Sequence, residues 1–359
     1  MWSHTSKNLS LAGSPKRILV IQTAFLGDVV LTTPFLQALR AEFPEAKIDF
    51  LATPAAIELL EPNPWKLKLI SYDKRGKDRG FFCFLRLIFK IRKEKYERIY
   101  CLHRSFRSGL ICFYSGAPFV IGFQEAPGHW AYHRKIPRQK YLYEAEKNLA
   151  LLQDRQDDET NFSPYPQLFS SQEDMAEAKK ILATLNDQSF VAISPSSVWP
   201  TKRWPAERFA DLALALWNEH AVPIVILSGK NPDDVKISAE IANVLQLKNV
   251  NCLNLAGKTK LGVLKTVIGC AKVLIANDSA PLHIAIAMNV PVLGVFGPTT
   301  KELGFFPLAP DDKALVAEIN LPCRPCGLHG HKRCPLGHFR CMLDNSVAHA
   351  HAQVNQLLT

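Results

Sequence analysis

The chain has 359 residues, of which 47% are hydrophobic and 21% charged, and a formal net charge of +10. This length suits two globular domains, and the composition excludes a disordered or fibrous protein. No apolar stretch reaches the ~18 residues that a membrane-spanning helix needs. Because the first fourteen residues lack the apolar core of a secretory signal, we expect a cytoplasmic protein with a short tail before its first strand.

The N-terminal half alternates short apolar runs with helical patterns. We expect strands at 17–22, 47–52, 98–102 and 119–123, with a helical pattern from Val30 to Leu39 between the first two. Strands separated by helices are typical of a parallel, doubly wound sheet. The first half of the chain is therefore predicted to form one Rossmann-like domain.

Positive charge is concentrated between Trp65 and Lys140, where 18 Lys and Arg residues stand against 5 Asp and Glu. A region of this kind predicts an anionic partner, which could be a phosphorylated substrate, an acidic membrane surface or nucleic acid. The alternative is a basic face that only keeps the protein soluble.

Within the basic region, residues 81–93 combine bulky apolar side chains with cations in a helical pattern. Such a helix could lie in a membrane interface, where anionic lipid head groups attract its cations. It could equally be a core helix whose cations reach water. We favour the core interpretation, because helical periodicity alone seldom separates the two.

A polar segment at 154–173, with two prolines and no sustained period, reads as a linker. The alternation then resumes with strands expected at 190–194, 223–228, 252–255, 273–276 and 290–296, and a helix at 206–219. We therefore expect an N-terminal domain at 1–165, a second Rossmann-like domain at 166–345 and a C-terminal helix at 346–359. A cleft between two such domains is a usual place for ligands.

The segment from Asn277 to His283 follows the end of an expected strand. Asp278 or Ser279 can cap the next helix, and Pro281 suits its first turn. The amides and the dipole at such a helix start form an anion site at the edge of the sheet. His283 either donates to a bound phosphate or simply packs on the sheet.

A second loop, 194–205, places small hydroxyl groups and two cations after another strand. Ser196 and Ser197 offer donors to phosphate oxygens, and Lys202 and Arg203 add positive charge. Together with the helix after Asp278, this loop gives two anion-binding segments at one edge of one sheet. That arrangement suits a nucleotide diphosphate.

The loop after the first strand contains Gly27 and Asp28. The glycine permits a tight turn, and the aspartate stands at the start of a helix. Simple helix capping would explain an isolated Gly-Asp pair. The three-glycine spacing of a dinucleotide-binding loop is absent.

These segments resemble the ADP-heptose:lipopolysaccharide heptosyltransferases of glycosyltransferase family 9. The resemblance runs from about Arg17 to Pro310, and its most specific part is 277–283, continued by 290–292 and 296–299. The stretches 102–108 and 201–205 look closest to the heptosyltransferase II branch. The resemblance implies the GT-B fold, with two doubly wound Rossmann-like domains facing a central cleft.

The family resemblance also implies a reaction. It is inverting transfer of heptose from ADP-L-glycero-D-manno-heptose to the lipopolysaccharide inner core, with heptosyl-Kdo2-lipid A as the acceptor and no cofactor or metal required. Asp28 would be the general base, and Lys202 would neutralise the departing diphosphate. The lipid-linked acceptor implies a cytoplasmic enzyme that could touch the inner-membrane surface, and no nucleic-acid partner.

Further roles follow residue by residue from the same resemblance. Asp278 would orient the donor sugar. Donor phosphates would be held by Ser196, Ser197, Ser279, Ala280, Pro281, Leu282 and His283, and the nucleoside end would lie at Gly257 and Lys258. The acceptor would face His103, Arg104 and Arg107. Ala280 stands where many relatives have glycine, so the backbone there is less able to approach the diphosphate.

Four cysteines near the C-terminus, Cys323, Cys326, Cys334 and Cys341, begin with a Cys-x-x-Cys pair. They could bind zinc tetrahedrally, although the second pair is spaced more widely than in common zinc ribbons. Packed thiols or an oxidation-prone cluster are the favoured interpretations.

Two other functions remain open at this point. One is a family 9 transferase with another acceptor, either Kdo2-lipid A or a non-lipid glycan. The other is a basic, zinc-containing nucleic-acid-binding protein, which would bind with a steep salt dependence and turn over no sugar nucleotide.

Overall fold

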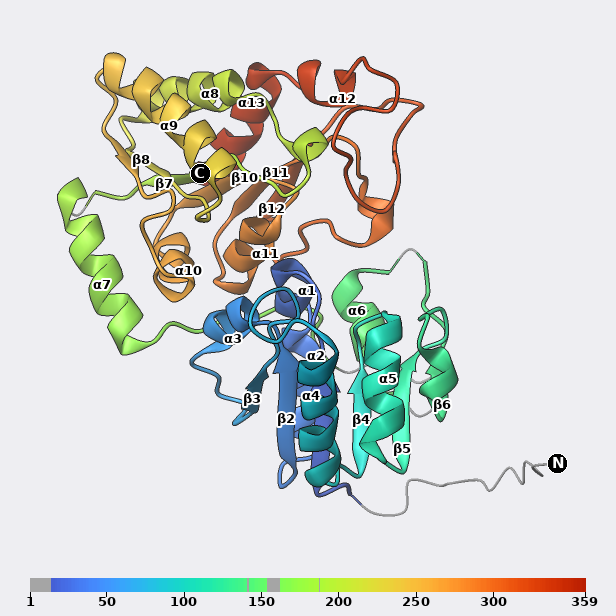
Figure 1. Cartoon of the computed structure of the whole chain (residues 1–359). Coiled ribbons are helices and arrows are strands. Elements are labelled where there is room, and N and C mark those ends of the chain that lie inside the picture. The colour runs from blue at the N-terminus through green and yellow to red at the C-terminus, as the bar shows by residue number, and fades with distance from the viewer. Residues whose placement is uncertain (1–13, 141, 154–161, 187) are drawn as a thin grey trace. The chain divides into compact units, whose positions relative to one another are not determined.

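The computed structural model describes residues 14–140, 142–153, 162–186 and 188–359. These residues form two compact units. The first unit comprises the chain up to Thr23 together with Phe35–Thr53 and Pro64–Arg138. The second unit comprises Ala24–Pro34, Pro54–Asn63 and Gln139–Thr359. Each unit contains one six-stranded parallel sheet (Figure 1).

The sheet of the first unit has the strand order β3-β2-β1-β4-β5-β6. Its strands are β1 (Arg17–Ile21), β2 (Lys47–Ala52), β3 (Lys68–Ser71), β4 (Arg98–Cys101), β5 (Phe119–Phe123) and β6 (Arg134–Ile136). All neighbouring strands are parallel, and the order reverses between β1 and β4. This is the Rossmann order, in which ligands bind beyond the carboxyl ends of the strands at the reversal point.

Helices α4 (Phe81–Lys93) and α5 (Phe106–Ser115) pack on one face of this sheet. Phe84, Leu87, Ile88 and Ile91 of α4 enter a core shared with β1 and β4. On the other face, Phe35 of α2 (Thr33–Glu42) meets the Tyr100 ring edge-on, with 5.3 Å between ring centroids. The core interpretation of residues 81–93 is therefore confirmed for the inward side of α4.

The sheet of the second unit has the order β12-β11-β10-β7-β8-β9. Its strands are β7 (Val191–Ser194), β8 (Ile224–Ile226), β9 (Cys252–Asn254), β10 (Val273–Asn277), β11 (Val292–Val295) and β12 (Ala314–Ala317). Counted from β7, this is again the Rossmann order, with its reversal between β7 and β10.

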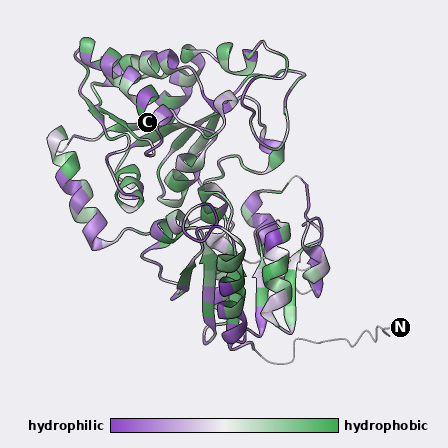
Figure 2. Ribbon diagram, viewed as in Figure 1, coloured by the Kyte–Doolittle hydropathy of each residue, from purple (hydrophilic) through white to green (hydrophobic). Residues whose placement is uncertain are grey.

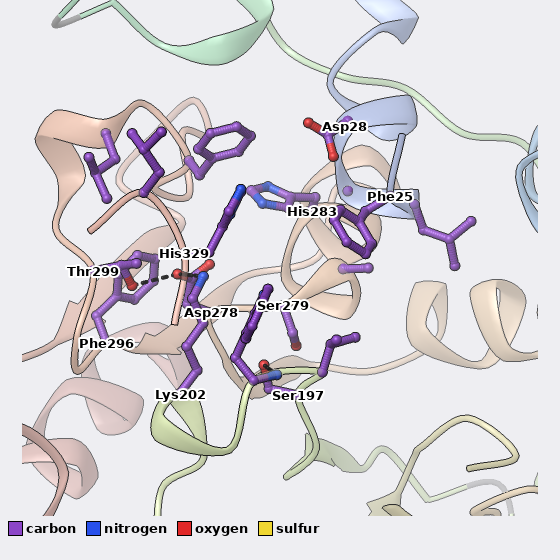
Figure 3. Close-up of a pocket in the computed structure, with 18 of the residues that line it drawn as sticks. Phe25, Asp28, Ser197, Lys202, Asp278, Ser279, His283, Phe296, Thr299 and His329 are labelled. Atoms are coloured by element: carbon purple, nitrogen blue, oxygen red, sulfur yellow. Dashed lines mark hydrogen bonds and ion pairs between the residues drawn. The ribbon is translucent and has the colours of Figure 1, made fainter. Parts of the chain in front are cut away.

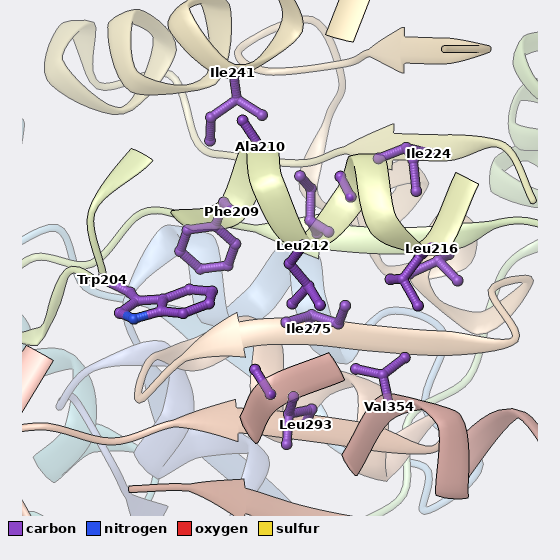
Figure 4. Close-up of a cluster of buried hydrophobic side chains, with 14 of the residues drawn as sticks. Trp204, Phe209, Ala210, Leu212, Leu216, Ile224, Ile241, Ile275, Leu293 and Val354 are labelled. Carbon is purple, nitrogen blue, oxygen red and sulfur yellow. The ribbon is translucent and has the colours of Figure 1, made fainter. Parts of the chain in front are cut away.

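The larger core of the second unit lies under α8 (Ala206–His220), α9 (Pro232–Leu247) and α13 (Val347–Leu358). Figure 4 shows Phe209, Leu212 and Leu216 of α8 directed at the sheet, with Val354 of α13 beside Leu293. Helices α10 (Leu261–Gly269) and α11 (Ala280–Ala287) lie on the other face (Figure 1). Leu282 of α11 packs closely against Gly294 of β11 there.

Two short segments from the first half of the chain belong to the second unit. One carries α1 (Leu26–Val30), and the other carries α3 (Pro54–Leu60). The Asn148 amide donates to the Leu31 carbonyl at 3.1 Å. The buried Lys265 ammonium donates to the Leu59 and Glu61 carbonyls, each at 2.9 Å. These buried bonds attach both segments to the second unit.

The remaining elements are short or peripheral. They are α6 (Glu144–Leu149), α7 (Gln172–Leu182), α12 (Arg340–Leu343) and the 3-10 turns η1 (His129–Ala131), η2 (Ala183–Leu185), η3 (Pro200–Lys202) and η4 (Lys301–Leu303). In the part of the chain that the structure describes, no helix is long and apolar enough to cross a membrane. The polar segment predicted as a linker falls partly on 154–161, outside the described residues, and ends where α7 begins.

All strands predicted from apolar runs are present, with ends shifted by a few residues at most. Three strands were not predicted: β3, β6 and β12. Each lies at an edge of its sheet. An edge strand has one neighbour and less cover, so it carries a weaker apolar signal than a central parallel strand.

Candidate active site

A pocket of about 230 Å³ lies in the second unit at the carboxyl ends of β7 and β10. This is the point where the strand order of the second sheet reverses, the expected ligand position for such a fold. Seven predicted site residues line it: Asp28, Ser197, Lys202, Asp278, Ser279, Ala280 and His283. Figure 3 shows Asp28 entering from α1, with Lys202, Asp278 and Thr299 grouped on the other side.

Lys202 and Asp278 form a buried ion pair in this pocket. The Lys202 ammonium donates to an Asp278 carboxylate oxygen at 2.5 Å, and the Thr299 hydroxyl donates to the same oxygen at 2.6 Å (Figure 3). Their side chains are only 10% and 6% exposed. The sequence predicted separate roles for the two residues, whereas the structure joins them across 76 positions. The pair fixes the Lys202 ammonium beside the start of α11.

Asn277 connects the two loops that form the floor of the pocket. This fully buried side chain donates to the Pro195 carbonyl at 2.7 Å and accepts from the Trp204 amide at 3.0 Å. The loop after β7 and the loop after β10 are therefore held in one arrangement. Ser279 is the N-cap residue of α11, and Pro281 lies in its first turn, as the sequence predicted.

Asp28 lies in the first turn of α1 and is half-buried at the pocket wall. Gly27 beside it has no side chain, and an added Cβ would stand 3.1 Å from the His283 ring. The glycine therefore allows α1 to approach α11 closely. This contact brings residues 25–28 to a pocket whose remaining lining residues all follow from Ser197 onward, about 170 positions later in the chain.

His283 lines the pocket and is also packed inside the unit. It is 3% exposed, and its Nδ1 atom is buried without a hydrogen-bond partner. The burial agrees with the packing interpretation made from the sequence, and donation to a phosphate stays a prediction.

We expect His283 to remain uncharged down to acidic pH. Burial lowers its pKa to about 4; Asp278 opposes this shift, and the Lys202 charge adds to it. In the unfolded chain a histidine has a pKa near about 6.5. Between these values the unfolded chain takes up a proton that folded His283 excludes, so the free energy of unfolding falls as the pH drops from about 6.5 towards 4.

Urea unfolding of the wild type and of His283→Gln, measured from neutral to acidic pH, checks this expectation. The variant should lose less stability on acidification than the wild type. Equal losses in the two proteins would show that His283 titrates like an exposed histidine.

One wall of the pocket comes from the cysteine-containing loop before α12, and no local pattern in the sequence pointed to it. Leu328 and His329 line the pocket, and the His329 ring stacks on Trp199 with centroids 6.0 Å apart. The Thr201 hydroxyl donates to the His331 carbonyl at 3.0 Å, which anchors the loop. Other lining residues that were not predicted are Phe25, Leu26, Val198, Phe296, Thr300, Leu303 and Phe305.

The other predicted donor residues surround the pocket without lining it. Ser196 is buried next to Ser197, Pro281 is half-buried, and Leu282 packs into the interior. Gly257 and Lys258 follow β9, at the carboxyl-end edge of the same sheet. Gly257 has a positive φ of 70°, and the Lys258 ammonium donates to the Asn254 carbonyl at 2.8 Å.

His103 and Arg107 line a separate, smaller pocket in the first unit, together with Lys74 and Tyr72. It lies beyond β1 and β4, where the first sheet reverses its order. The Arg107 guanidinium donates to the Tyr72 hydroxyl at 3.2 Å. Arg104, the third predicted acceptor residue, follows His103 in the chain; it is exposed and does not line this pocket.

The His103 ring is held in this pocket by hydroxyl groups. Its Nδ1 atom lies 2.9 Å from the hydroxyl oxygens of both Thr23 and Ser108. Burial lowers its pKa to about 4, helped by Lys74 and Arg104. His103 is therefore neutral near pH 7, and we expect it to contact a ligand by hydrogen bonding while the nearby cations supply the charge.

The four C-terminal cysteines are free thiols, with Cys341 buried and the other three half-buried. The Cys326 thiol donates to the Cys323 carbonyl at 3.3 Å. Among the described residues, no group of three or more His, Cys, Asp or Glu side chains has the arrangement to hold a metal ion.

Comparison with known proteins agrees with this geometry. The sequence model of "Glycosyltransferase family 9 (heptosyltransferase)" matches residues 84–336. Lipopolysaccharide heptosyltransferase 2 of Escherichia coli strain K12 is 26% identical over 294 residues, which cover 80% of this chain and 84% of that protein. Lipopolysaccharide heptosyltransferase 3 of Escherichia coli is 30% identical over 290 residues, or 77% and 82% of the two chains.

The structure of ADP-heptose lipopolysaccharide heptosyltransferase II from E. coli is similar over nearly the whole chain. Its TM-score is 0.78 at 25% sequence identity, covering 95% of this chain and 98% of the other. This likeness and the two parallel α/β sheets confirm the GT-B architecture that the sequence resemblance implied.

Proposed function

The chain belongs to glycosyltransferase family 9, and we propose that it moves heptose from ADP-L-glycero-D-manno-heptose to the lipopolysaccharide inner core, with inversion. The observation that carries this proposal is the pocket in the second unit. It brings a carboxylate on α1, a buried Lys202–Asp278 pair and the start of α11 around one space. The names of the similar proteins support heptose as the sugar.

In this proposal the donor diphosphate binds at the N-terminus of α11. The positive end of the helix dipole and the Lys202 ammonium both favour an anion there. As the bond to the sugar breaks, negative charge grows on the diphosphate, and a cation fixed beforehand stabilises that charge without rearrangement. Lys202 is held in this way by Asp278, so the reaction needs no metal ion for this step.

Asp28 is the proposed general base. Its position in the first turn of α1 places a carboxylate at the wall of the donor pocket. A carboxylate within hydrogen-bond reach of the acceptor hydroxyl can remove its proton as the hydroxyl oxygen attacks the anomeric carbon. The diphosphate leaves from the opposite side of that carbon, which gives inversion.

The pocket of the first unit is the proposed acceptor site. Lys74 and Arg107 supply positive charge, and neutral His103 supplies a hydrogen-bonding ring. These groups suit the phosphate and carboxylate groups of heptosyl-Kdo2-lipid A. Because such an acceptor is embedded in lipid, we also propose that the enzyme works at the cytoplasmic face of the inner membrane.

The experiment is an acceptor comparison with purified protein. ADP release from ADP-heptose should require an acceptor and should be fastest with heptosyl-Kdo2-lipid A. Kdo2-lipid A and soluble glycans are the alternative acceptors. Faster release with either of these would replace the proposed acceptor, and no release with any would contradict heptose transfer. The anomeric configuration of the product, measured by NMR, tests inversion.

A further inference from the structure

The outward side of α4 in the first unit carries large apolar side chains that the core does not cover. Phe81 and Phe89 are each 68% exposed, and Phe82 is 81% exposed. Phe82 and Phe89 are seven positions apart, which places them on one side of the helix. Figure 2 shows α4 combining green apolar residues with purple basic ones. The core therefore accounts for the inward side of residues 81–93, and the membrane interpretation still applies to the outward side.

The neighbouring helix α5 and the turn η1 extend the exposed aromatic surface. Phe113 meets Tyr114 at 5.1 Å and Trp130 at 5.4 Å between ring centroids, and Phe106 meets Trp130 at 6.0 Å. All four of these rings are between 43% and 57% exposed. Gly109 and Gly128 lie so close that an added Cβ on either would clash with the other's backbone. This contact holds η1, and so Trp130, against α5.

We call the seven side chains Phe81, Phe82, Phe89, Phe106, Phe113, Tyr114 and Trp130 the aromatic face. Helices α4 and α5 pack together in the core, and the Arg92 guanidinium donates to the Tyr114 carbonyl at 3.2 Å. Helix α4 precedes β4 and α5 precedes β5, two neighbouring parallel strands, and both helices pack on the same face of the sheet.

Positive charges outnumber negative ones around the aromatic face, where the nearby acids in the chain are Asp73 and Asp78 before α4, Glu94 after it and Glu125 before η1. Helices α4 and α5 contain no Asp or Glu, and α4 exposes Arg86, Lys90, Arg92 and Lys93. The loop before α4 adds exposed Arg75, Lys77 and Arg79. Exposed aromatic rings with a basic border match an interface that is apolar inside and negatively charged at its surface.

We propose that the aromatic face docks on the surface of a bilayer that contains anionic lipids. Phenylalanine and tryptophan side chains gain free energy by entering the boundary between head groups and acyl chains, and the cations gain by meeting anionic head groups. Single-stranded RNA also stacks on aromatic rings, but proteins that bind it combine those rings with a basic groove that tracks the nucleic-acid backbone, whereas the exposed α4 rings are phenylalanines on the side of one helix. A lipid surface needs no such groove.

The proposal rests on the proposed function in one respect only: a lipid-embedded acceptor explains why a transferase would dock there. The docking itself is measured without donor or acceptor. Purified full-length protein is sedimented with vesicles of phosphatidylcholine alone or of phosphatidylcholine with phosphatidylglycerol. Binding should occur on the anionic vesicles, should weaken with added salt, and should be near background on the neutral ones.

The test variant is the double substitution Phe82→Ser and Phe89→Ser, and the matched control is Leu247→Ser. Leu247 is 84% exposed on α9 of the second unit and is not part of the aromatic face. The double variant should bind anionic vesicles about tenfold or more weakly, because two apolar insertions are lost. The control should bind like the wild type, and both variants should keep the wild-type melting temperature.

Two outcomes would overturn the proposal: no binding of the wild type to anionic vesicles, or a double variant that binds them as well as the wild type does. In the second case, a changed oligomeric state in light scattering would assign the aromatic face to a second copy of the chain, and a loss of RNA binding would assign it to RNA. Because no sugar transfer is measured, none of these outcomes depends on the proposed function.

Discussion

Replacement of Asp28 by asparagine should lower kcat by about 10²–10⁴-fold, the usual contribution of a general base. Asparagine has nearly the same size and shape, so the contact of α1 with α11 at Gly27 and His283 should persist. An amide cannot take up the acceptor proton, and the loss should therefore appear in the chemical step. The measurement is ADP release at saturating donor and acceptor, with binding of ADP followed by calorimetry.

The matched control for Asp28 is Asp233→Asn. Asp233 also lies in the first turn of a helix of the second unit, α9, but it does not line the pocket. The Asp233→Asn variant should keep the wild-type kcat, and both variants should bind ADP with wild-type affinity. A normal kcat for Asp28→Asn would show that another group removes the proton. Loss of ADP binding together with kcat would instead assign Asp28 to the donor.

Replacement of Lys202 by methionine should lower kcat/KM for the donor by about 10²–10³-fold, because the fixed cation next to the diphosphate is lost. The same change leaves the buried Asp278 carboxylate bound by the Thr299 hydroxyl but without the charge of Lys202. Breaking one side of a buried ion pair commonly costs about 3–5 kcal/mol of stability. A simple loss of activity in this variant would therefore have two explanations.

The double variant Lys202→Met with Asp278→Asn separates the loss of the cation from the loss of stability. The neutral asparagine can still accept the Thr299 hydroxyl, so the double variant should recover most of the stability that the single variant loses. Donor turnover should stay low, since the cation is still absent. Recovery of turnover along with stability would show that Lys202 acts only by holding the fold.

Much of the pocket could be anticipated from short segments. The loop after Asn277 contains its own helix start, with Ser279 at the N-cap and Pro281 in the first turn, and these signals depend only on near neighbours. The paired hydroxyls and cations of 194–205 were visible in the same way. The ion pair between Lys202 and Asp278 could not be predicted from the sequence, because a contact between residues 76 positions apart leaves no local pattern. The position of His329 at the pocket could not be predicted either, because its stacking partner Trp199 is distant in the chain.

The sequence by itself determined the central strands, the inward side of α4 and the two loops, after β7 and β10, that line the pocket. These features follow from apolar runs and capping residues, which report burial and local hydrogen bonding. Only the tertiary structure decided that α1 and α3 belong to the second unit, that β3, β6 and β12 complete the sheets, and which rings of α4 stay uncovered. Those outcomes depend on which distant surfaces meet, and periodicity along the chain carries no information about the partner on the other side.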